Sequence, residues 1–222
     1  MKFWSTVIFA TLGFAVMVTL GVWQLQRLEW KEGELAKITS AQQAAPVPLD
    51  ALSDPAAEKY RPVFVTGTLG TDEIFILVST RDRGAGYRVI SPLETATGRR
   101  VLIDRGYIPL EAKDVSRPLQ TDITVNGNVH VPDDRNASTP QNDVAGNIWF
   151  ARDVDDLAAA LQTEPVLIVA RSDTGQGILP LPVTTEGIPN NHLSYAIQWF
   201  LFAAIWAGVT TVLAWRIRAR TD

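Results

Sequence analysis

Two long uncharged segments lie near the ends of this chain, and a segment of mixed polarity separates them. The first runs from Phe3 to Gln26, which is 24 positions, and the second from Leu193 to Trp215, which is 23. A helix needs about 20 apolar residues to cross a bilayer, so each segment predicts one membrane span. Tryptophans lie toward both ends of each segment, where aromatic belts form in membrane proteins.

The first segment is expected to be an uncleaved anchor, and the second is expected to set the orientation. A signal peptide has a shorter apolar core and a small-residue cleavage site, whereas this apolar run continues directly to Arg27. The second segment is followed by Arg216, Arg218 and Arg220, while residues 172–191 before it contain no Lys or Arg. Since Lys and Arg are enriched on the cytoplasmic side, both termini are predicted to be cytoplasmic and the middle periplasmic. A span that begins at residue 3 leaves no room for a mitochondrial transit peptide, so a bacterial inner membrane is the expected location.

The middle of the chain is predicted to be mainly β. A polar stretch to Ile38 continues the first helix, and a linker that contains several prolines follows over Thr39–Glu58. Seven segments rich in β-branched and aromatic residues predict strands. They are Val63–Leu69, Ile74–Ser79, Tyr87–Leu93, Val101–Ile108, Ile123–Val131, Ile148–Ala151 and Val166–Ala170. Apolar positions at helical spacing predict one amphipathic helix from Val154 to Leu161, with Asp153 as its N-cap.

These elements predict an α+β membrane protein, in which two transmembrane helices flank an antiparallel β domain that is barrel- or sandwich-like. Gly67 and Gly127 lie within strand patterns, where glycine often marks a bend or bulge. Asn126-Gly127 is equally compatible with a hairpin turn. The expected domains are a helix at 1–26, a polar helix extension and linker at 27–58, a β-rich domain at 59–191, a helix at 192–215 and a basic tail at 216–222.

Composition excludes several classes of function. The net charge is −4, from 20 basic and 24 acidic residues, so nucleic acid is not an expected partner. The absence of cysteine excludes disulfide scaffolds, zinc ribbons, cysteine nucleophiles and covalently attached haem. Two histidines and two methionines are too few soft ligands for a copper chaperone. The sequence lacks the G-x-S-x-G, H-E-x-x-H and P-loop motifs, and it is not predicted to be an enzyme.

A few polar positions remain as candidates for chemistry. Asp82-Arg83-Gly84 and Asp104-Arg105-Gly106 are alike, and each is interpreted as a turn or a surface ion pair. His130 is interpreted as a solvated histidine on a strand. His192 differs, because it opens the second span at its outer interface.

His192 is the strongest candidate ligand in the sequence. On a helix one face is shared by six residues, which are His192, Tyr195, Ala196, Trp199, Ala203 and Trp206. Neutral imidazole is a standard axial ligand of haem iron, and the apolar face beneath it suits a porphyrin plane. The alternative is an interfacial histidine that only hydrogen-bonds lipid headgroups or the outer domain.

Five sequence blocks together resemble the surfeit-locus-one (Shy-one) family of cytochrome c oxidase assembly factors. They are LGVWQLQRLEWK at 20–31, YRPV with VTG at 60–67, GYRV with PL at 86–93, VLIDRGYIP at 101–109, and NHLSYA with QWF at 191–200. The blocks occur in the family's order, with a predicted span at each end. The chain is identified as a bacterial member of this family.

The resemblance implies a role in assembling haem–copper cytochrome c oxidase and in maturation of the haem a centre of its subunit I. It places the family's closing-motif histidine at His192, and its opening block supplies Trp23, Gln24, Arg27 and Trp30. The expected partners are subunit I, haem a synthase and membrane lipid.

We therefore expect transient binding of haem a near the outer membrane interface. His192 is expected to be the axial ligand of the haem iron, Tyr195 and Trp199 to line the macrocycle, and Trp23 and Arg27 to complete the pocket, with Arg27 pairing a propionate.

Two other functions are compatible with parts of the sequence. A cofactor-free scaffold that binds an oxidase subunit needs the same topology, so the sequence does not separate it from a haem carrier. An envelope sensor is disfavoured, because only seven residues follow the second span. Small residues predict a close approach of the two spans, and these residues are Gly13, Met17 and Gly21 on the first span and Ala203 and Ala207 on the second.

Overall fold

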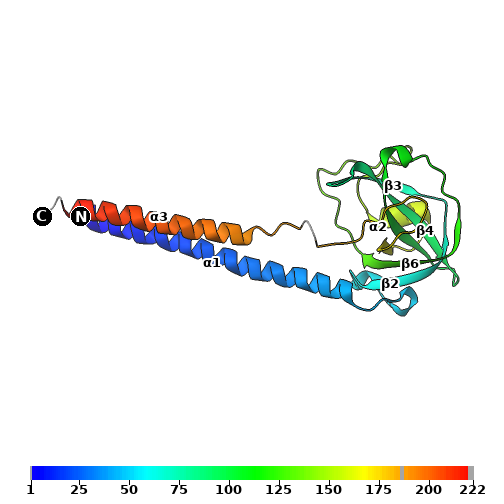
Figure 1. The fold of residues 1–222 in the computed structure, drawn as a ribbon, viewed down its shortest axis with the longest axis horizontal. Coiled ribbons are helices and arrows are strands. Elements are labelled where there is room, and N and C mark those ends of the chain that lie inside the picture. Colours follow the sequence, from blue (N-terminus) through cyan, green and yellow to red (C-terminus); the bar gives the residue numbers. More distant parts are fainter. Residues whose placement is uncertain (1, 186–187, 220–222) are drawn as a thin grey trace. The chain divides into compact units, whose positions relative to one another are not determined.

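The computed structural model describes residues 2–185 and 188–219 (Figure 1). The chain divides into two compact units, a helical unit built from its two ends and a β domain of residues 38–184. Arg220 of the basic tail lies outside the described residues.

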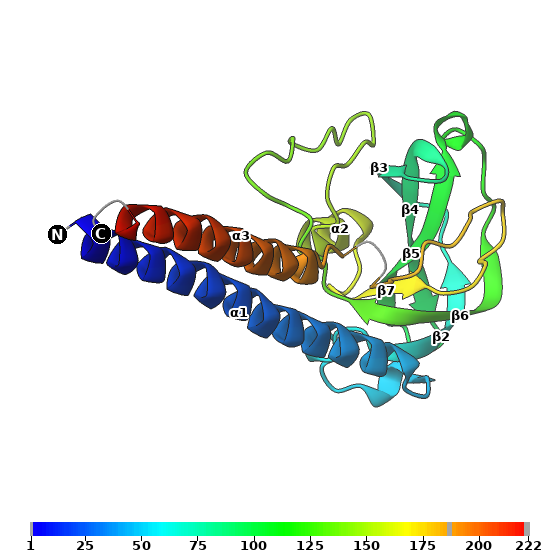
Figure 2. The same cartoon turned by 60° about the vertical axis from the view of Figure 1, so that its left-hand side comes forward.

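The helical unit consists of α1 (Lys2–Gln43) and α3 (His192–Arg218), which lie side by side (Figures 1 and 2). Both helices are long and apolar enough to cross a membrane, as predicted. The polar extension ends at Gln43, so the prediction that it ends at Ile38 is wrong. Helix-compatible residues continue up to Pro46, the first residue that cannot be accommodated in a helix interior.

Small residues let the two helices approach closely, as the sequence predicts. A Cβ atom on Gly13 would lie 2.7 Å from the ring of Trp206, and one on Gly21 would lie 2.6 Å from the ring of Phe200. The indole Nε1 of Trp206 donates a hydrogen bond of 2.9 Å to the backbone oxygen of Ala10. Each bulky ring of α3 therefore packs where α1 has no side chain.

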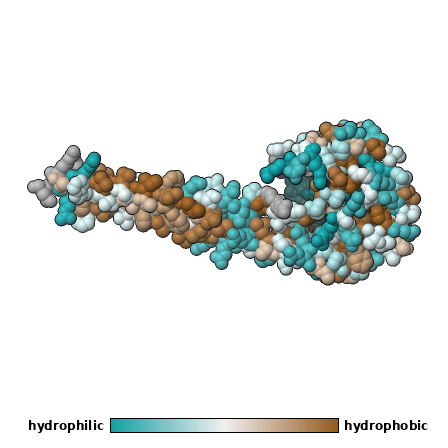
Figure 3. All heavy atoms as spheres, in the orientation of Figure 1, coloured by the Kyte–Doolittle hydropathy of each residue, from teal (hydrophilic) through white to brown (hydrophobic). Residues whose placement is uncertain are grey.

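The buried positions of α3 recur every seven residues, at Ala196, Ala203 and Thr210. This spacing is typical of the seam of a left-handed helix pair. Apolar side chains away from the seam are exposed, and Figure 3 shows a mainly hydrophobic surface along the helices. Continuous exposed apolar surface of this kind is typical of helices that contact lipid.

The β domain contains seven strands, three short 3₁₀ helices and one α-helix. The strands are β1 (Val47–Pro48), β2 (Pro62–Leu69), β3 (Ile74–Thr80), β4 (Gly84–Thr95), β5 (Arg100–Pro109), β6 (Gln120–His130) and β7 (Leu167–Ala170). The helices are η1 (Leu49–Ala51), η2 (Pro55–Ala57), η3 (Leu110–Ala112) and α2 (Val154–Leu161). The strand order is β1-β2-β6-β7-β5-β4-β3, and β2 also pairs with β4, so β2, β6, β7, β5 and β4 close a barrel (Figure 2).

Gly67 is the position at which β2 passes from one neighbour to the other. It pairs with Ile123 of β6 and with Thr95 of β4, beside a register shift. A Cβ atom here would collide with the backbone oxygen of Glu94, so only glycine fits. The prediction of a bend at Gly67 is confirmed. Gly127 lies inside β6, paired on both sides with β2 and β7, so the hairpin-turn interpretation is wrong there.

The core fills the barrel and the space beneath α2. Completely buried side chains inside the barrel include Val63, Leu93 and Ile168. Leu157 of α2 packs on an outer cluster of the sheet with Leu102. The predicted bounds of α2 are confirmed, with Asp153 in the N-cap position, although its side chain makes no capping bond.

Two segments differ from the prediction. Ile148–Ala151 is not a strand, because it forms isolated bridges, of which one pairs Trp149 with Ile76 of β3. The Trp149 backbone bonds the edge of β3 on both sides of this bridge, and its ring is buried in the cluster beneath α2. The predicted linker Thr39–Glu58 is also partly ordered, since it holds the end of α1, β1, η1 and η2.

Candidate functional site

His192 is the first residue of α3 and meets α1 through one direct polar contact. Its ring nitrogen Nδ1 lies 2.8 Å from the amide oxygen Oε1 of Gln24, a residue 168 positions earlier in the chain. Both side chains are partly buried. Gly21, one turn before Gln24, packs on Phe200, and Ala196, one turn after His192, is buried. The contact therefore joins two backbones that are already held together by packing.

The second ring nitrogen of His192, Nε2, has no hydrogen bond to any residue that the structure describes. A histidine that ligates a metal is commonly held by a hydrogen bond at one ring nitrogen while the other faces the metal. His192 has this arrangement, so its donor set fits an axial ligand of haem iron.

The aromatic residues predicted to line the macrocycle lie near His192 with different exposures. Tyr195, one turn into α3, is 50% exposed, and Trp23 of α1 is 52% exposed. Trp199 is partly buried and makes an edge-on contact with Phe202, with ring centroids 6.0 Å apart. Tyr195 and Trp23 therefore present open aromatic surface, while Trp199 is partly covered and contacts a ring of its own helix.

Arg27 lies one helical turn after Gln24 and stacks on a neighbour of its own helix. Its guanidinium carbon is 3.8 Å from the ring centroid of Trp30. Such cation–π contacts occupy the face of the guanidinium and leave its N–H groups free to donate. Arg27 forms no ion pair with the described residues, so it is free to pair an anionic group such as a propionate.

The face of α3 predicted to carry a porphyrin is covered by α1 at its C-terminal part, around Ala203 and Trp206. Ala203 is buried, and Trp206 packs on Gly13 and bonds the Ala10 backbone. Of the predicted face, the part near the start of α3 stays open. The structure thus brings His192 and Gln24 into contact, and it leaves Trp23, Arg27 and Tyr195 exposed without direct bonds to His192.

The two similar triplets of the β domain have different environments. Asp82 and Arg83 are exposed in the turn between β3 and β4, as predicted. Asp104 and Arg105 are buried within β5, at 0% and 1% exposure, so the interpretation as a turn or surface pair is wrong for them. The strand places these charges inside the domain because long-range partners surround them.

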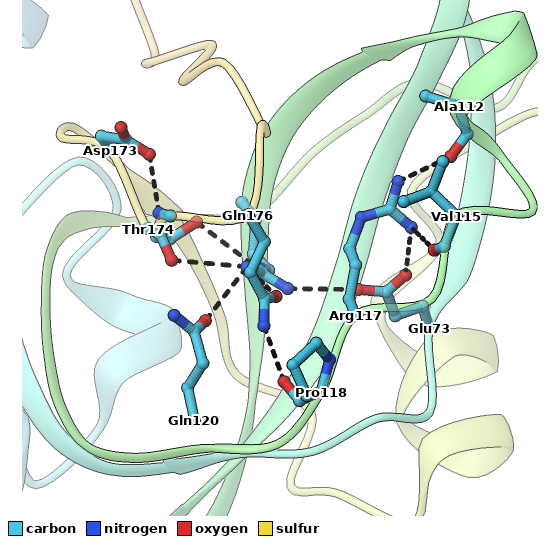
Figure 4. A network of polar contacts seen from close by, with 11 residues as sticks. Glu73, Ala112, Val115, Arg117, Pro118, Gln120, Asp173, Thr174 and Gln176 are labelled. Atoms are coloured by element: carbon cyan, nitrogen blue, oxygen red, sulfur yellow. Dashed lines mark hydrogen bonds and ion pairs between the residues drawn. The ribbon is translucent and has the colours of Figure 1, made fainter.

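Arg105 is the centre of a buried polar network, and Figure 4 labels its partners Glu73, Thr174 and Gln176. Its guanidinium bonds Glu73 at 3.1 Å, Gln176 at 2.8 Å and the Thr174 hydroxyl at 3.1 Å. Burial lowers the pKa of Arg105, and the carboxylate of Glu73 acts against this. The second oxygen of Glu73 accepts from Arg117 at 2.9 Å. The network joins residues of three loops to the barrel, which is a structural role.

His130 is not the solvated histidine that the sequence suggests. Its Nδ1 is buried and has no hydrogen bond within the described part of the chain. Burial, and next the positive charge of Arg152, lower its pKa to about 4. The ring lies 5.8 Å from that of Tyr60. Its enclosed position makes His130 a less suitable ligand than His192.

Comparison with known proteins decides the family. A sequence model of the SURF1 family matches residues 11–204. The chain belongs to the SURF1 family. It is 29% identical to Surfeit locus protein 1 of Rattus norvegicus over 205 residues, which cover 82% of this chain and 66% of the rat protein. Surfeit locus protein 1 of Homo sapiens is 29% identical over 210 residues, covering 83% of this chain and 69% of the human protein. The SURF1-like protein of Monosiga brevicollis is 32% identical over 206 residues, covering 84% and 78%.

The SURF1 match includes most of α1, the first half of α3 and the whole β domain, so the resemblance found in the sequence blocks is confirmed. The chain spans about two thirds of the rat and human relatives. Gln24 and His192 both lie within the matched region. Sequence reasoning noted Gln24 in the first block without giving it a role. The role of Gln24 could have been predicted from its position in the sequence: it lies one turn after Gly21 on the side of α1 that faces α3, at the level where α3 begins.

Proposed function

We propose that this SURF1-family protein is a non-enzymatic assembly factor for a haem–copper cytochrome c oxidase. In this proposal it receives haem a near the outer membrane interface and aids its insertion into subunit I. Haem a is the cargo, a haem a synthase is the proposed donor, and subunit I is the proposed acceptor. Membership of the SURF1 family supports the assembly role, and the site at the start of α3 supports the haem cargo.

The observation that carries the haem proposal is the arrangement of His192. Its Nδ1 is held by Gln24, and its Nε2 is free of bonds to the described residues. The guanidinium of Arg27 would pair a propionate, and Trp23, Tyr195 and Trp199 would contact the macrocycle. A charge-assisted bond to a carboxylate is stronger than a neutral one, so Arg27 would contribute to retention of the cargo.

A haem spectrum of the purified protein tests this proposal. The full chain is produced in cells that synthesise haem a and is purified in detergent. We expect a Soret band in the wild type, its loss or a large shift in His192→Ala, and no change in His130→Ala. These are the only two histidines of the chain, so no third imidazole can substitute. A His192→Ala protein with an unchanged Soret band would overturn the ligand assignment.

The proposed location is a bacterial inner membrane, with both termini cytoplasmic and the β domain periplasmic. Arg216 and Arg218 at the end of α3 support this orientation. A reporter enzyme that is active only in the periplasm should be active when fused after residue 110 and silent when fused after residue 220. The opposite pattern would reverse the orientation.

The second candidate function is a membrane scaffold that binds an oxidase subunit without touching haem. The packing of Ala203 and Trp206 against α1 favours it, because this part of the helix pair has no open face for a porphyrin. The scaffold predicts that His192→Ala supports a normal haem a content in the assembled oxidase. The haem carrier predicts a lower haem a content with unchanged synthesis of the oxidase subunits.

A further inference from the structure

The contact between Gln24 and His192 determines which ring nitrogen carries the hydrogen. Oε1 of Gln24 lies 2.8 Å from Nδ1 of His192. An amide oxygen accepts hydrogen bonds and cannot donate, so the hydrogen of the neutral ring is on Nδ1 and the lone pair is on Nε2. Unconstrained histidine favours the opposite tautomer, with the hydrogen on Nε2. The contact therefore reverses the intrinsic preference of the ring.

The surroundings of Gln24 and His192 favour this contact over other hydrogen bonds of the two side chains. Within the described part of the chain, neither Gln24 nor His192 has another side-chain hydrogen bond. The partly buried setting strengthens the bond electrostatically relative to water. The packing of Gly21 on Phe200 fixes the register of the two helices one turn away, so Gln24 is held opposite the ring.

We propose that Gln24 is a positioning residue that holds His192 in its Nδ1–H tautomer, presents Nε2 to haem iron and sets the strength of the iron–imidazole bond. The part that concerns iron rests on the proposed function, whereas the tautomer does not. A hydrogen bond donated by the non-ligating nitrogen raises the basicity of the ligand. A neutral amide raises it less than a carboxylate does, which suits a protein that must release its haem.

Three variants separate positioning from folding. Gln24→Leu removes the acceptor, and Gln24→Glu replaces it with a stronger one. Gln26→Leu is the matched control, because Gln26 is exposed on the same helix two residues later. We expect haem affinity to fall about 10- to 100-fold in Gln24→Leu. It should be kept or increased in Gln24→Glu and unchanged in Gln26→Leu. In resonance Raman spectra of the ferrous protein, the iron–imidazole stretch should move down in Gln24→Leu and up in Gln24→Glu.

A measurement without haem tests the tautomer directly. The full chain, labelled with ¹⁵N at its two histidines, is studied by NMR in detergent at pH 9, where imidazole is neutral. The spectrum of His130→Ala assigns the signals of His192. We expect a protonated Nδ1 in the wild type and in Gln26→Leu. Gln24→Leu should shift the population toward Nε2–H.

The outcomes distinguish this inference from the proposed function. A wild-type His192 with its hydrogen on Nε2 would overturn the inference, as would a Gln24→Leu protein with unchanged tautomer and unchanged haem affinity. If the tautomer shifts as expected but the wild type binds no haem, the proposed function is wrong and the control of the ring by Gln24 is upheld. Tautomer and affinity that change together in Gln24→Leu, with rescue by Gln24→Glu, support both.

Discussion

Asp104 and Arg88 form a buried ion pair between neighbouring strands, with Oδ2 of the carboxylate 2.5 Å from Nη1 of the guanidinium. The same oxygen lies 3.4 Å from Nη1 of Arg152, which precedes α2. Arg152 in turn bonds Asp134 at 2.6 Å. One carboxylate with no exposed surface therefore joins β4, β5 and the start of α2.

Replacement of Asp104 by Ala should strongly destabilise the β domain. It leaves the guanidinium groups of Arg88 and Arg152 without their shared partner, and removal of one member of a buried ion pair costs about 3–5 kcal/mol. The measurement is chemical denaturation of the purified chain in detergent, followed by circular dichroism. Asp82→Ala is the matched control, because Asp82 begins the same triplet on the surface and should change the free energy of unfolding by no more than about 0.5 kcal/mol. Equal effects of the two substitutions would contradict the assignment.

The contrast between these triplets shows where sequence reasoning reaches its limit. Identical letters at 82–84 and 104–106 form a surface turn and a buried strand. Hydrophobic patterning identified β2 to β7, because each of these strands carries its own signal, although it missed the two-residue β1 and predicted a strand at Ile148–Ala151 that does not form. The partners of Asp104 and Arg105 come from distant segments, and the neighbouring residues in the sequence do not indicate which segments these are. Only the closed barrel, with β2 bonded to β4, brings those segments together.

The candidate site shows the same division between local features, which the sequence predicts, and long-range contacts, which it does not. His192 could be chosen from its position at the start of a span, a property visible in one segment. Its contact with Gln24 depends on the register between two helices, which is fixed by the rings of Trp206 and Phe200 against Gly13 and Gly21. The small residues predicted a close approach of the helices, but they did not specify which residues face each other.

Gly13→Leu should weaken the packing of the two helices. The Cβ atom alone would lie 2.7 Å from the Trp206 ring, so the indole must move and its hydrogen bond to Ala10 is strained or lost. Overpacking of this kind costs about 1–3 kcal/mol. The measurement is the loss of helical circular dichroism during titration with a denaturing detergent. Ala15→Leu is the control, since Ala15 is exposed on the same helix and its replacement should have little effect.

The β domain should fold without the membrane helices. Residues 38–184 form one compact unit with its own barrel and core. The end of α1 is fixed within this unit, because Gln42 donates to the backbone oxygen of Val183 at 3.1 Å. A fragment of these residues should be soluble and mainly β by circular dichroism. It should bind no haem, since Gln24 and His192 lie outside it. Stoichiometric haem binding by the fragment would move the site to the β domain.

His130 should make the stability of the β domain depend on pH. In the folded chain its pKa is lowered to about 4, through burial first and then repulsion by Arg152 and Lys59, whereas the ordinary value is 6.5. Well above pH 6.5 the ring is neutral in both the folded and the unfolded chain, so it does not make the free energy of unfolding depend on pH. Between pH 6.5 and about 4 the unfolded chain binds a proton that the folded chain does not, so stability falls as the pH falls. The loss should level off below pH 4, at about 3 kcal/mol.

His130→Phe isolates this contribution, because the phenyl ring keeps the contact with Tyr60 and cannot bind a proton. The urea midpoint of the wild type should fall relative to that of the variant as the pH falls from 7 toward 4, since only the wild type has the His130 ring that the unfolded chain protonates. The carboxylates of the domain titrate in both proteins, so the difference between the two curves removes their effect. Parallel curves across this range would show that His130 is accessible to protons in the folded state. That result would contradict the burial of Nδ1 in the folded chain.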